Sequence, residues 1–570
     1  MPTAAYNRDS RGASRLIEAW PKSNALTEAK AKDLLTALGF AVDKVKKLAP
    51  VSRIENFHVI LKRPENGQKN HYRHPIAAFG SEAENKGFRL VYLLGKSDTD
   101  RLIDTFEAIG SARPVLVVLD CALQLAQRRQ LARKLKEEHS EGIFAVIDRV
   151  VITYLSAHYA DTAVNRMLMA LIMPFAYCQP YIEKSADIIP PEMFIGRKEE
   201  LDRIISPTGA NLVYGGRQLG KSALLQMAKN RVDRNENGDR AIIIDLKGLH
   251  YQKAARKIAQ SLYDEGILTQ EYDDGDWDEL GRAIRKRLNE GHPAIPYLLL
   301  MLDEADDFIA SCDEVKYHPF EVLKDIQGNE KKNFKFVVAG LRNVIRFRKQ
   351  TFLSDNNVFP HLESLTIMPF RSMEARELLE IPLYYLGFRF EKNEETESLI
   401  STILGTTNYF PGLLQLYCSK LIQAMRKDYG GYLETQSPPY LIRKEHIKKV
   451  LAQQSLQQEI RDKFFITLKV DEDDYYYLLA LLAAYHVHSL HPEDGTSVRD
   501  LNALASDLGI EKIAALDEEN ISALLEEMRE LNVLQSLGNG RYRFARQSFL
   551  QMMGTMEQIE DALCRYMEDA

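Results

Sequence analysis

The sequence has few of the residues that mark secreted, zinc-binding or membrane proteins. It contains five cysteines with no CxxC spacing and no paired histidines, namely Cys121, Cys178, Cys312, Cys418 and Cys564. This pattern disfavours a disulfide framework and a zinc site. No stretch approaches the roughly 20 apolar residues that a membrane span needs, and the N-terminus lacks the apolar segment of a signal peptide. These absences predict a cytoplasmic protein that stays out of the membrane.

The chain also lacks an excess of basic charge. Its formal net charge is −7, so no global field attracts nucleic acid, and any such contact must come from a local patch. Hydrophobic residues make up 45% and charged residues 27% of the 570 positions, which is ordinary for folded domains. A chain of this length predicts three or four domains of roughly 150 residues each.

Strand and helix patterns divide the chain into five regions. The first is an α+β region and the second alternates strands with helices, as in βαβ units. A segment with three prolines, QPYIEKSADIIPPEMF, then indicates a linker. After it we expect an α/β P-loop core with a parallel sheet, a helical lid and a C-terminal domain. The predicted bounds are 1–87, 88–184, 185–370, 371–465 and 470–570.

The strongest motif is GGRQLGKS, a G-x-x-x-x-G-K-S loop that lies between an apolar strand and an apolar helix. Its glycines let the backbone curl so that N–H groups face phosphates, and the helix N-terminus adds its positive dipole end. We expect Lys221 to reach the β- and γ-phosphates of ATP and Ser222 to bind Mg²⁺. The residues predicted to contact nucleotide here are Gly215, Gly216, Arg217, Gln218, Leu219, Gly220, Lys221, Ser222 and Ala223.

A second motif, YLLLMLDEADDF, is a buried strand that ends in two carboxylates. It predicts that Asp303 holds Mg²⁺ and that Glu304 orients and polarises the attacking water. Asp306 and Asp307 are interpreted as a solvated helix start. Another strand, AIIIDLKG, lies between the two motifs, so we expect the phosphate-loop strand and the acid-bearing strand not to be neighbours in the sheet. That arrangement is typical of P-loop proteins with a catalytic glutamate.

A third strand, FKFVVAG, is followed by polar residues that could sense the γ-phosphate. Arg342 and Asn343 are the candidates for this catalytic role. The alternative is that the arginines only coat a surface helix, because exposed arginines are common.

Together these motifs resemble a known family. FIGRKEEL, GGRQLGKSALL, LLLMLDEAD, FKFVVAGLRN and GTTNYFPGLLQLYCSKLI look like a STAND-class or archaeal-type AAA+ ATPase, similar to the origin-recognition branch, over residues of about 190–550. The resemblance implies that Ile195, Gly196 and Arg197 lie against the adenine and that the lid proline, Pro411, touches the nucleotide. The lid carries Asn-Tyr-Phe-Pro-Gly rather than a plain Gly-x-Pro. Pro411 is therefore also open to interpretation as an ordinary first residue of a helix.

The C-terminal region predicts a winged helix, because three helices precede a hairpin with a Gly-Asn-Gly turn. Its third helix is acidic, which is electrostatically unfavourable in a DNA groove. The wing is basic and could contact phosphates or a carboxylate on the ATPase core. The acidic positions are Glu518, Glu519, Glu526, Glu527 and Glu530, with Arg529 beside them, and the wing positions are Arg541, Arg543 and Arg546.

Three functional hypotheses follow. The first is an ATP-binding and ATP-hydrolysing switch that couples nucleotide state to self-association or to a protein partner, with bacterial defence as the setting that the resemblance suggests. The second is a DNA-associated AAA+ ATPase of initiator or transposition-regulator type, which would use the wing and the run RRQLARKLK. The third is a module that holds nucleotide without turnover. An N-terminal nuclease built on Glu55 and Lys62 is disfavoured because no Glu-x-Lys set accompanies them, and His486, His488 and His491 are interpreted as a solvated loop.

Overall fold

The computed structural model describes most of the chain in two compact units. The first unit comprises Met1–Ile195, Arg371–Leu404 and Leu414–Leu456, and the second comprises Gly196–Phe370, Gly405–Leu413 and Gln457–Ala570. The described residues are 10–21, 26–50, 54–62, 87–93, 99–109, 114–138, 143–160, 163–176, 178–182, 189–190, 193–233, 237–272, 275–290, 293–328, 332–341, 362–428, 438–469, 474–490 and 495–567.

The N-terminal part of the first unit is a five-stranded mixed sheet in the order β1-β2-β3-β4-β5. The strands are β1 (Val42–Lys47), β2 (Glu55–Leu61), β3 (Phe88–Leu93), β4 (Val115–Leu119) and β5 (Phe144–Ile147). Strands β1 to β3 pair antiparallel and β3 to β5 pair parallel. Its helices are α1 (Ser10–Ala19), α2 (Glu28–Ala37), α4 (Thr99–Ile109), α5 (Leu125–Glu138), α6 (Arg149–Ala157) and α7 (Val164–Ile172).

This sheet joins the two N-terminal regions that the sequence separates at residue 87. Strand β3 pairs with β2 on one side and with β4 on the other, so the expected boundary falls inside one sheet. The change from antiparallel to parallel pairing at β3 explains why the pattern along the chain changes there. Every residue of β4 and β5 is buried, as expected for parallel strands covered by helices.

The rest of the first unit belongs to the predicted lid. Its elements are α15 (Ser372–Tyr385), β11 (Phe388–Phe390), α16 (Thr396–Thr406), α17 (Pro411–Asp428), β12 (Tyr440–Ile442) and α19 (Lys444–Leu451). The end of α16 and the start of α17, within Gly405–Leu413, belong to the second unit. The sequence predicts only helices here, but β11 and β12 form a short parallel pair. Strands of three residues are too short to show a period-two pattern.

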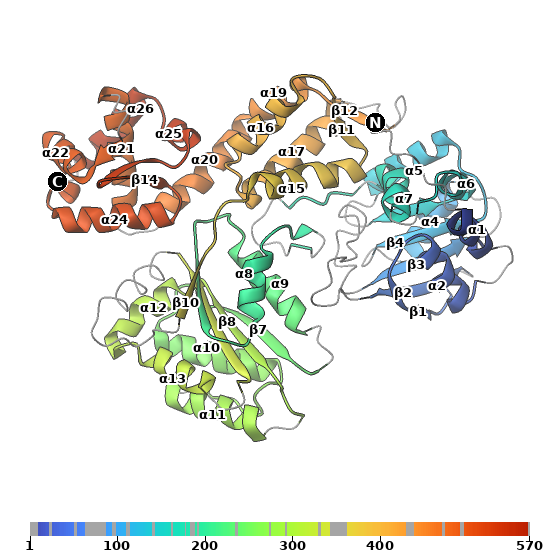
Figure 1. Cartoon of the computed structure of the whole chain (residues 1–570), viewed down its shortest axis with the longest axis horizontal. Coiled ribbons are helices and arrows are strands. Elements are labelled where there is room, and N and C mark those ends of the chain that lie inside the picture. The colour runs from blue at the N-terminus through green and yellow to red at the C-terminus, as the bar shows by residue number, and fades with distance from the viewer. Residues whose placement is uncertain are drawn as a thin grey trace. The chain divides into compact units, whose positions relative to one another are not determined.

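The second unit contains a five-stranded parallel sheet in the order β10-β6-β9-β8-β7 (Figure 1). The strands are β6 (Ala210–Tyr214), β7 (Arg240–Asp245), β8 (Leu298–Asp303), β9 (Phe334–Gly340) and β10 (Leu362–Thr366), and the helices are α8 (Lys198–Ile205), α9 (Lys221–Asp233), α10 (Tyr251–Asp264), α11 (Trp277–Glu290), α12 (Asp306–Cys312) and α13 (His318–Gln327). Strand β9 separates β6 from β8, which confirms the prediction that the phosphate-loop strand and the acid-bearing strand are not neighbours.

One lysine inside this sheet ties β9 to the end of α8. Lys335 is fully buried, and its ammonium donates to the carbonyl oxygens of Arg203 and Ser206 at 2.7 and 2.8 Å. A helix end leaves its last carbonyls without intrahelical partners, and a lysine there satisfies them. Burial lowers the pKa of Lys335 to about 8.

The C-terminal part of the second unit combines helices with a small antiparallel sheet in the order β13-β15-β14. Its elements are α20 (Gln454–Leu468), α21 (Tyr475–Leu490), β13 (Thr496–Ser497), α22 (Val498–Asp507), α23 (Glu511–Ala514), α24 (Glu518–Glu530), β14 (Leu534–Gly538), β15 (Arg541–Phe544), α25 (Gln547–Met553) and α26 (Met556–Met567). The assignment of this domain as a winged helix stays a prediction.

Two polar side chains of this domain have internal roles that the sequence does not reveal. His486 is buried, and its Nδ1 lies 3.0 Å from the Thr496 hydroxyl, so it belongs to the interior rather than to a solvated loop. Glu527 of the acidic helix α24 is buried and accepts a hydrogen bond from the Tyr476 hydroxyl.

Among the described residues, no cluster of three or more histidine, cysteine or carboxylate side chains is arranged for a metal ion. No helix in the described part of the chain has the length and apolarity needed to cross a membrane.

Candidate nucleotide site

The phosphate loop, Gly215–Ser222, begins directly after β6 and ends in the first turn of α9. Gly215 has φ +154° and approaches the strap, residues 367–370 after β10, so closely that a Cβ atom would lie 2.5 Å from the carbonyl oxygen of Ile367. Gln218 and Gly220 also have positive φ values, 65° and 90°. These conformations are uncommon for residues with side chains, and here they curl the loop before the helix starts.

Lys221, the first residue of α9, is buried at the mouth of this loop. Its ammonium donates to the carbonyl oxygens of Gly215 at 2.8 Å and Gly216 at 3.2 Å. Burial lowers the pKa of Lys221 to about 8, and the nearby carboxylates of Glu304 and Asp303 oppose that decrease. The loop and the acidic strand end therefore meet around one lysine.

The acidic pair follows from the last residue of β8. Asp303 is buried, and its Oδ1 accepts the backbone N–H of Glu304 at 3.0 Å. Burial raises the pKa of Asp303, while hydrogen bonds from the Ser222 side chain and the Glu304 N–H oppose the increase. Glu304 has left-handed backbone, φ 49°, which turns it away from the strand direction. The structure thus brings Lys221, Ser222, Asp303 and Glu304 together.

Asp306 and Asp307 are not merely a solvated helix start, as the sequence suggests. Asp306 accepts the backbone N–H of Leu341 at 2.7 Å, and Asp307 accepts that of Gly248 at 2.9 Å. Each carboxylate fixes the loop that follows a neighbouring strand, β9 or β7. The DEADD run therefore holds the carboxyl edge of the sheet together around the candidate site.

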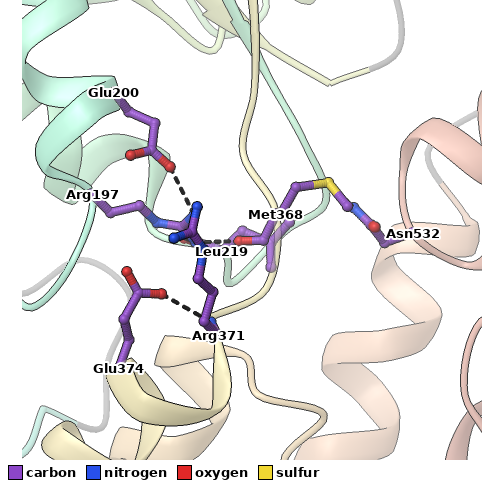
Figure 2. A network of polar contacts seen from close by, with 7 residues as sticks. All are labelled: Arg197, Glu200, Leu219, Met368, Arg371, Glu374 and Asn532. Carbon is purple, nitrogen blue, oxygen red and sulfur yellow. Dashed lines mark hydrogen bonds and ion pairs between the residues drawn. The ribbon is translucent and has the colours of Figure 1, made fainter.

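Arg197 lies at the centre of a network that reaches the phosphate loop (Figure 2). It has left-handed backbone, φ 57°, and its guanidinium is buried. The guanidinium donates to the carbonyl oxygens of Met368 and, at 3.4 Å, Leu219, and pairs with Glu200 at 3.2 Å. It also lies 5.2 Å from the ring centroid of Phe370. These contacts tie the phosphate loop to the strap that follows β10.

The other residues predicted to contact the nucleotide form three sets. Pro411 begins α17 and is buried beside Gly412, whose N–H donates to the carbonyl oxygen of Gln218 at 3.2 Å. Pro411 therefore lies next to the phosphate loop as well as at the first position of a helix. Arg342 and Asn343 lie outside the described residues. Gly196, with φ 67°, precedes Arg197, and Ile195 is buried in the first unit.

Ala223, Arg217 and the C-terminal domain complete the surroundings of the loop. Ala223 is half-buried in the first turn of α9. Arg217 and Gln218 line a small cavity of about 20 Å³ together with Asn408, Phe410, Leu413, Lys463, Phe464, Leu531, Asn532, Val533, Phe549 and Met552. A Cβ atom on Gly216 would lie 3.1 Å from the carbonyl oxygen of Leu531.

Sequence reasoning does not find the residues that approach the loop from distant segments. Met368, Phe370 and Leu531 carry no motif, because their role depends only on main-chain oxygens or on an aromatic face. The one available signal is the unusual Asn-Tyr-Phe in front of Pro411, where Asn408 and Tyr409 both have left-handed backbone.

The order β10-β6-β9-β8-β7, with the phosphate loop after β6 and the acidic pair after β8, decides the fold class. The chain has the fold of a P-loop NTPase. This confirms the α/β class predicted from the sequence.

Comparisons with known proteins give distant likenesses only. No family model and no curated protein matches the chain. The Walker-type ATPase PABY2304 of Pyrococcus abyssi has 12% identity and a TM-score of 0.46, over 65% of this chain and 99% of its own. The Aeropyrum pernix ORC2 protein has 14% identity and a TM-score of 0.44, over 68% and 97%. The Thermotoga maritima RuvB Holliday junction branch migration motor has 12% identity and a TM-score of 0.32, over 64% and 96%. At such scores the function has to be argued from the site itself.

Proposed function

We propose that this P-loop protein binds and hydrolyses ATP and uses the nucleotide state as a switch. The observation that carries the proposal is the convergence of one buried lysine, one hydroxyl and two carboxylates at the carboxyl edge of the sheet. Phosphoryl transfer needs positioning and charge stabilisation more than covalent chemistry, and these groups supply both.

Lys221 is placed to exchange its present partners for phosphate oxygens. Its ammonium is bonded to two neutral carbonyl groups of the loop itself. Phosphate oxygens carry full charge and form stronger, charge-assisted hydrogen bonds. ATP would therefore draw the ammonium away from Gly215 and Gly216 while the loop N–H groups and the start of α9 receive the phosphates.

The donor set also suits magnesium. The Ser222 hydroxyl and the Asp303 carboxylate are hydrogen-bonded to one another, so two oxygen ligands of the kind that Mg²⁺ prefers already lie side by side. Ser222 and Asp303 would hold the ion, which when bound would neutralise charge on the β- and γ-phosphates. Glu304, next to Asp303, would accept a proton from the attacking water.

The switch assignment extends the resemblance to AAA+ and STAND ATPases. In this proposal the C-terminal domain is a winged helix. A conformational change in the phosphate loop is transmitted to that domain through the residues that border Gly216 and Gln218. The readout would be self-association or binding of a protein partner, in a setting such as bacterial defence.

The DNA-associated alternative has less support from the described residues. Arg541 donates to the carbonyl oxygen of Gly495 at 3.0 Å, and Arg546 lies over the ring of Tyr409. In the basic run of α5, Arg128 is buried in an ion pair with Asp148, and Lys134 pairs with Asp100. Side chains engaged in this way have less freedom to meet a phosphate backbone.

The test is ATP turnover by the wild type and the Lys221→Ala variant, with and without duplex DNA. We expect the wild type to turn over ATP without DNA and Lys221→Ala to bind none. Equal turnover by the two proteins, or the absence of ATP binding by the wild type, would remove the proposal. Turnover only with DNA would favour the alternative.

A further inference from the structure

A turn in front of α17 connects the phosphate loop with the C-terminal domain. Its sequence is Asn408-Tyr409-Phe410-Pro411-Gly412, the segment that departs from a plain Gly-x-Pro. Asn408 and Tyr409 have φ values of 53° and 59°, so two successive residues with side chains adopt left-handed backbone. Such conformations persist when the surrounding structure fixes them, and they gather at functional sites.

The loop end of this turn is fixed by the main chain. Gly412 N–H donates to the carbonyl oxygen of Gln218, the left-handed residue at the tip of the phosphate loop. A Cβ atom on Gly412 would lie 2.1 Å from the Gln218 amide oxygen, so the two residues are closely packed in this conformation of the Gln218 side chain. Tyr409 in turn accepts the N–H of Phe370 at 3.0 Å, and the ring of Phe370 faces the Arg197 guanidinium.

The other end of the turn is fixed by the C-terminal domain. The Arg546 guanidinium lies 4.8 Å from the ring centroid of Tyr409, which suits a cation–π interaction. Beside it, Ser548 bonds to the Asn408 side chain, and the rings of Phe410 and Phe549 meet edge to face at 6.1 Å. Three successive residues of the turn therefore contact three residues at the start of α25.

We propose that Arg546 is a positioning residue for ATP binding, which acts through Tyr409 on the phosphate loop without touching the nucleotide. Arg546 holds Tyr409, the turn holds Gly412 against Gln218, and this contact keeps the loop in its curled conformation before ATP arrives. Preorganisation of this kind raises affinity because less ordering remains to be done on binding. The inference rests on the proposed ATP binding. It assigns to Arg546, one of the arginines of the predicted wing, a role other than DNA contact.

The experiment compares variants of the full chain. They distinguish loss of the cation or of the aromatic ring from a change in side-chain size. Arg546→Ala and Tyr409→Ala remove the contact, whereas Arg546→Lys and Tyr409→Phe keep a cation over an aromatic ring. Arg543→Ala is the matched control, because it removes the same charge three residues earlier, at an exposed position of β15. The measurements are the Kd and KM for ATP, kcat, and hydrogen exchange of peptides that cover Gly215–Ser222 and β8.

We expect both contact-removing variants to weaken ATP binding by about two- to fivefold, the range of a partly exposed cation–π interaction. Their phosphate-loop peptides should exchange faster while β8 is unchanged, and kcat at saturating ATP should stay at the wild-type value. The double variant should lose no more than either single one, and the two conservative variants should behave as wild type.

Unchanged loop exchange in Arg546→Ala, or unchanged or tighter ATP binding, overturns the assignment. Faster exchange in β8 as well as in the loop also overturns it, since that marks a general loss of stability. A wild type that binds no ATP would instead refute the proposed function, and loop exchange would still decide whether Arg546 positions the loop.

Discussion

At the scale of single residues, the candidate site is organised around Lys221. The lysine is buried among backbone carbonyls, with two carboxylates near enough to oppose the fall in its pKa. A P-loop lysine in this environment is only partly charged near pH 8, whereas its task with phosphates requires the ammonium form. Binding of ATP and protonation of Lys221 are therefore coupled.

This coupling predicts that ATP binding takes up a proton at alkaline pH. The lowered pKa means that the free protein loses the Lys221 proton as pH rises through about 8, and phosphate oxygens favour the protonated form. Affinity should therefore fall above about pH 8 and be independent of this group below about pH 7. Calorimetry in two buffers with different heats of ionisation measures the uptake. A Lys221→Arg variant that still binds should show none, and equal uptake by both proteins would contradict the assignment.

The second residue-scale prediction concerns Glu304. Glu304→Gln keeps the shape of the side chain and removes the base, so ATP should bind normally while turnover falls by roughly a hundredfold or more. Single-turnover kinetics separates the two effects. Asp313→Asn is a suitable control, since Asp313 is an exposed carboxylate that follows α12 outside the candidate site. Turnover unchanged in Glu304→Gln would assign the base elsewhere.

At the scale of elements, β9 and α8 are joined by a buried charge. Lys335→Met should destabilise the protein by about 2 kcal/mol, because two helix-end carbonyls lose a charged donor. Urea unfolding measures the change. Lys332→Met provides the comparison, because Lys332 is exposed just before the same strand. Equal midpoints for the two variants would show that the carbonyls find other donors.

Individual elements show which parts of the fold can be predicted from the sequence and which cannot. The phosphate loop and the acidic strand are predictable because each is a local pattern between an apolar strand and a helix. The break at residue 87 is misleading because β3 pairs with strands from both sides of it. The contact of Arg197 with Met368 joins residues 171 positions apart through a main-chain oxygen, and no residue type records such a contact.

Predictions about ionisable side chains were the least reliable, for a related physical reason. Asp306, His486 and Glu527 all appear solvent-facing by residue type, yet each has an internal partner. A buried polar group is stable only when it is hydrogen-bonded, and the partner usually comes from elsewhere in the chain. The sequence therefore gives the chemistry of a side chain, whereas the residues that surround it are found only in the structure.

At the scale of the whole molecule, the switch hypothesis predicts a large effect of ATP on stability. At a hundredfold excess of ATP over its Kd, binding should stabilise the folded protein by about 2.7 kcal/mol. Thermal unfolding with and without ATP measures this shift, and Lys221→Ala should show none. Light scattering on the same samples should show an increase in mass with ATP that duplex DNA does not alter. A mass that is constant with ATP would count against assembly as the readout.

Strand β10 has a consequence for solubility. It pairs with β6 on one side, and no described strand pairs with the other side. A strand edge without a partner can recruit the same edge of a second molecule and start aggregation. Glu363, the second residue of β10, is half exposed and has Arg203 as its ion-pair partner. A second strand that added to this edge would have to desolvate the charged pair, so Glu363 and Arg203 disfavour the growth of an intermolecular sheet from β10.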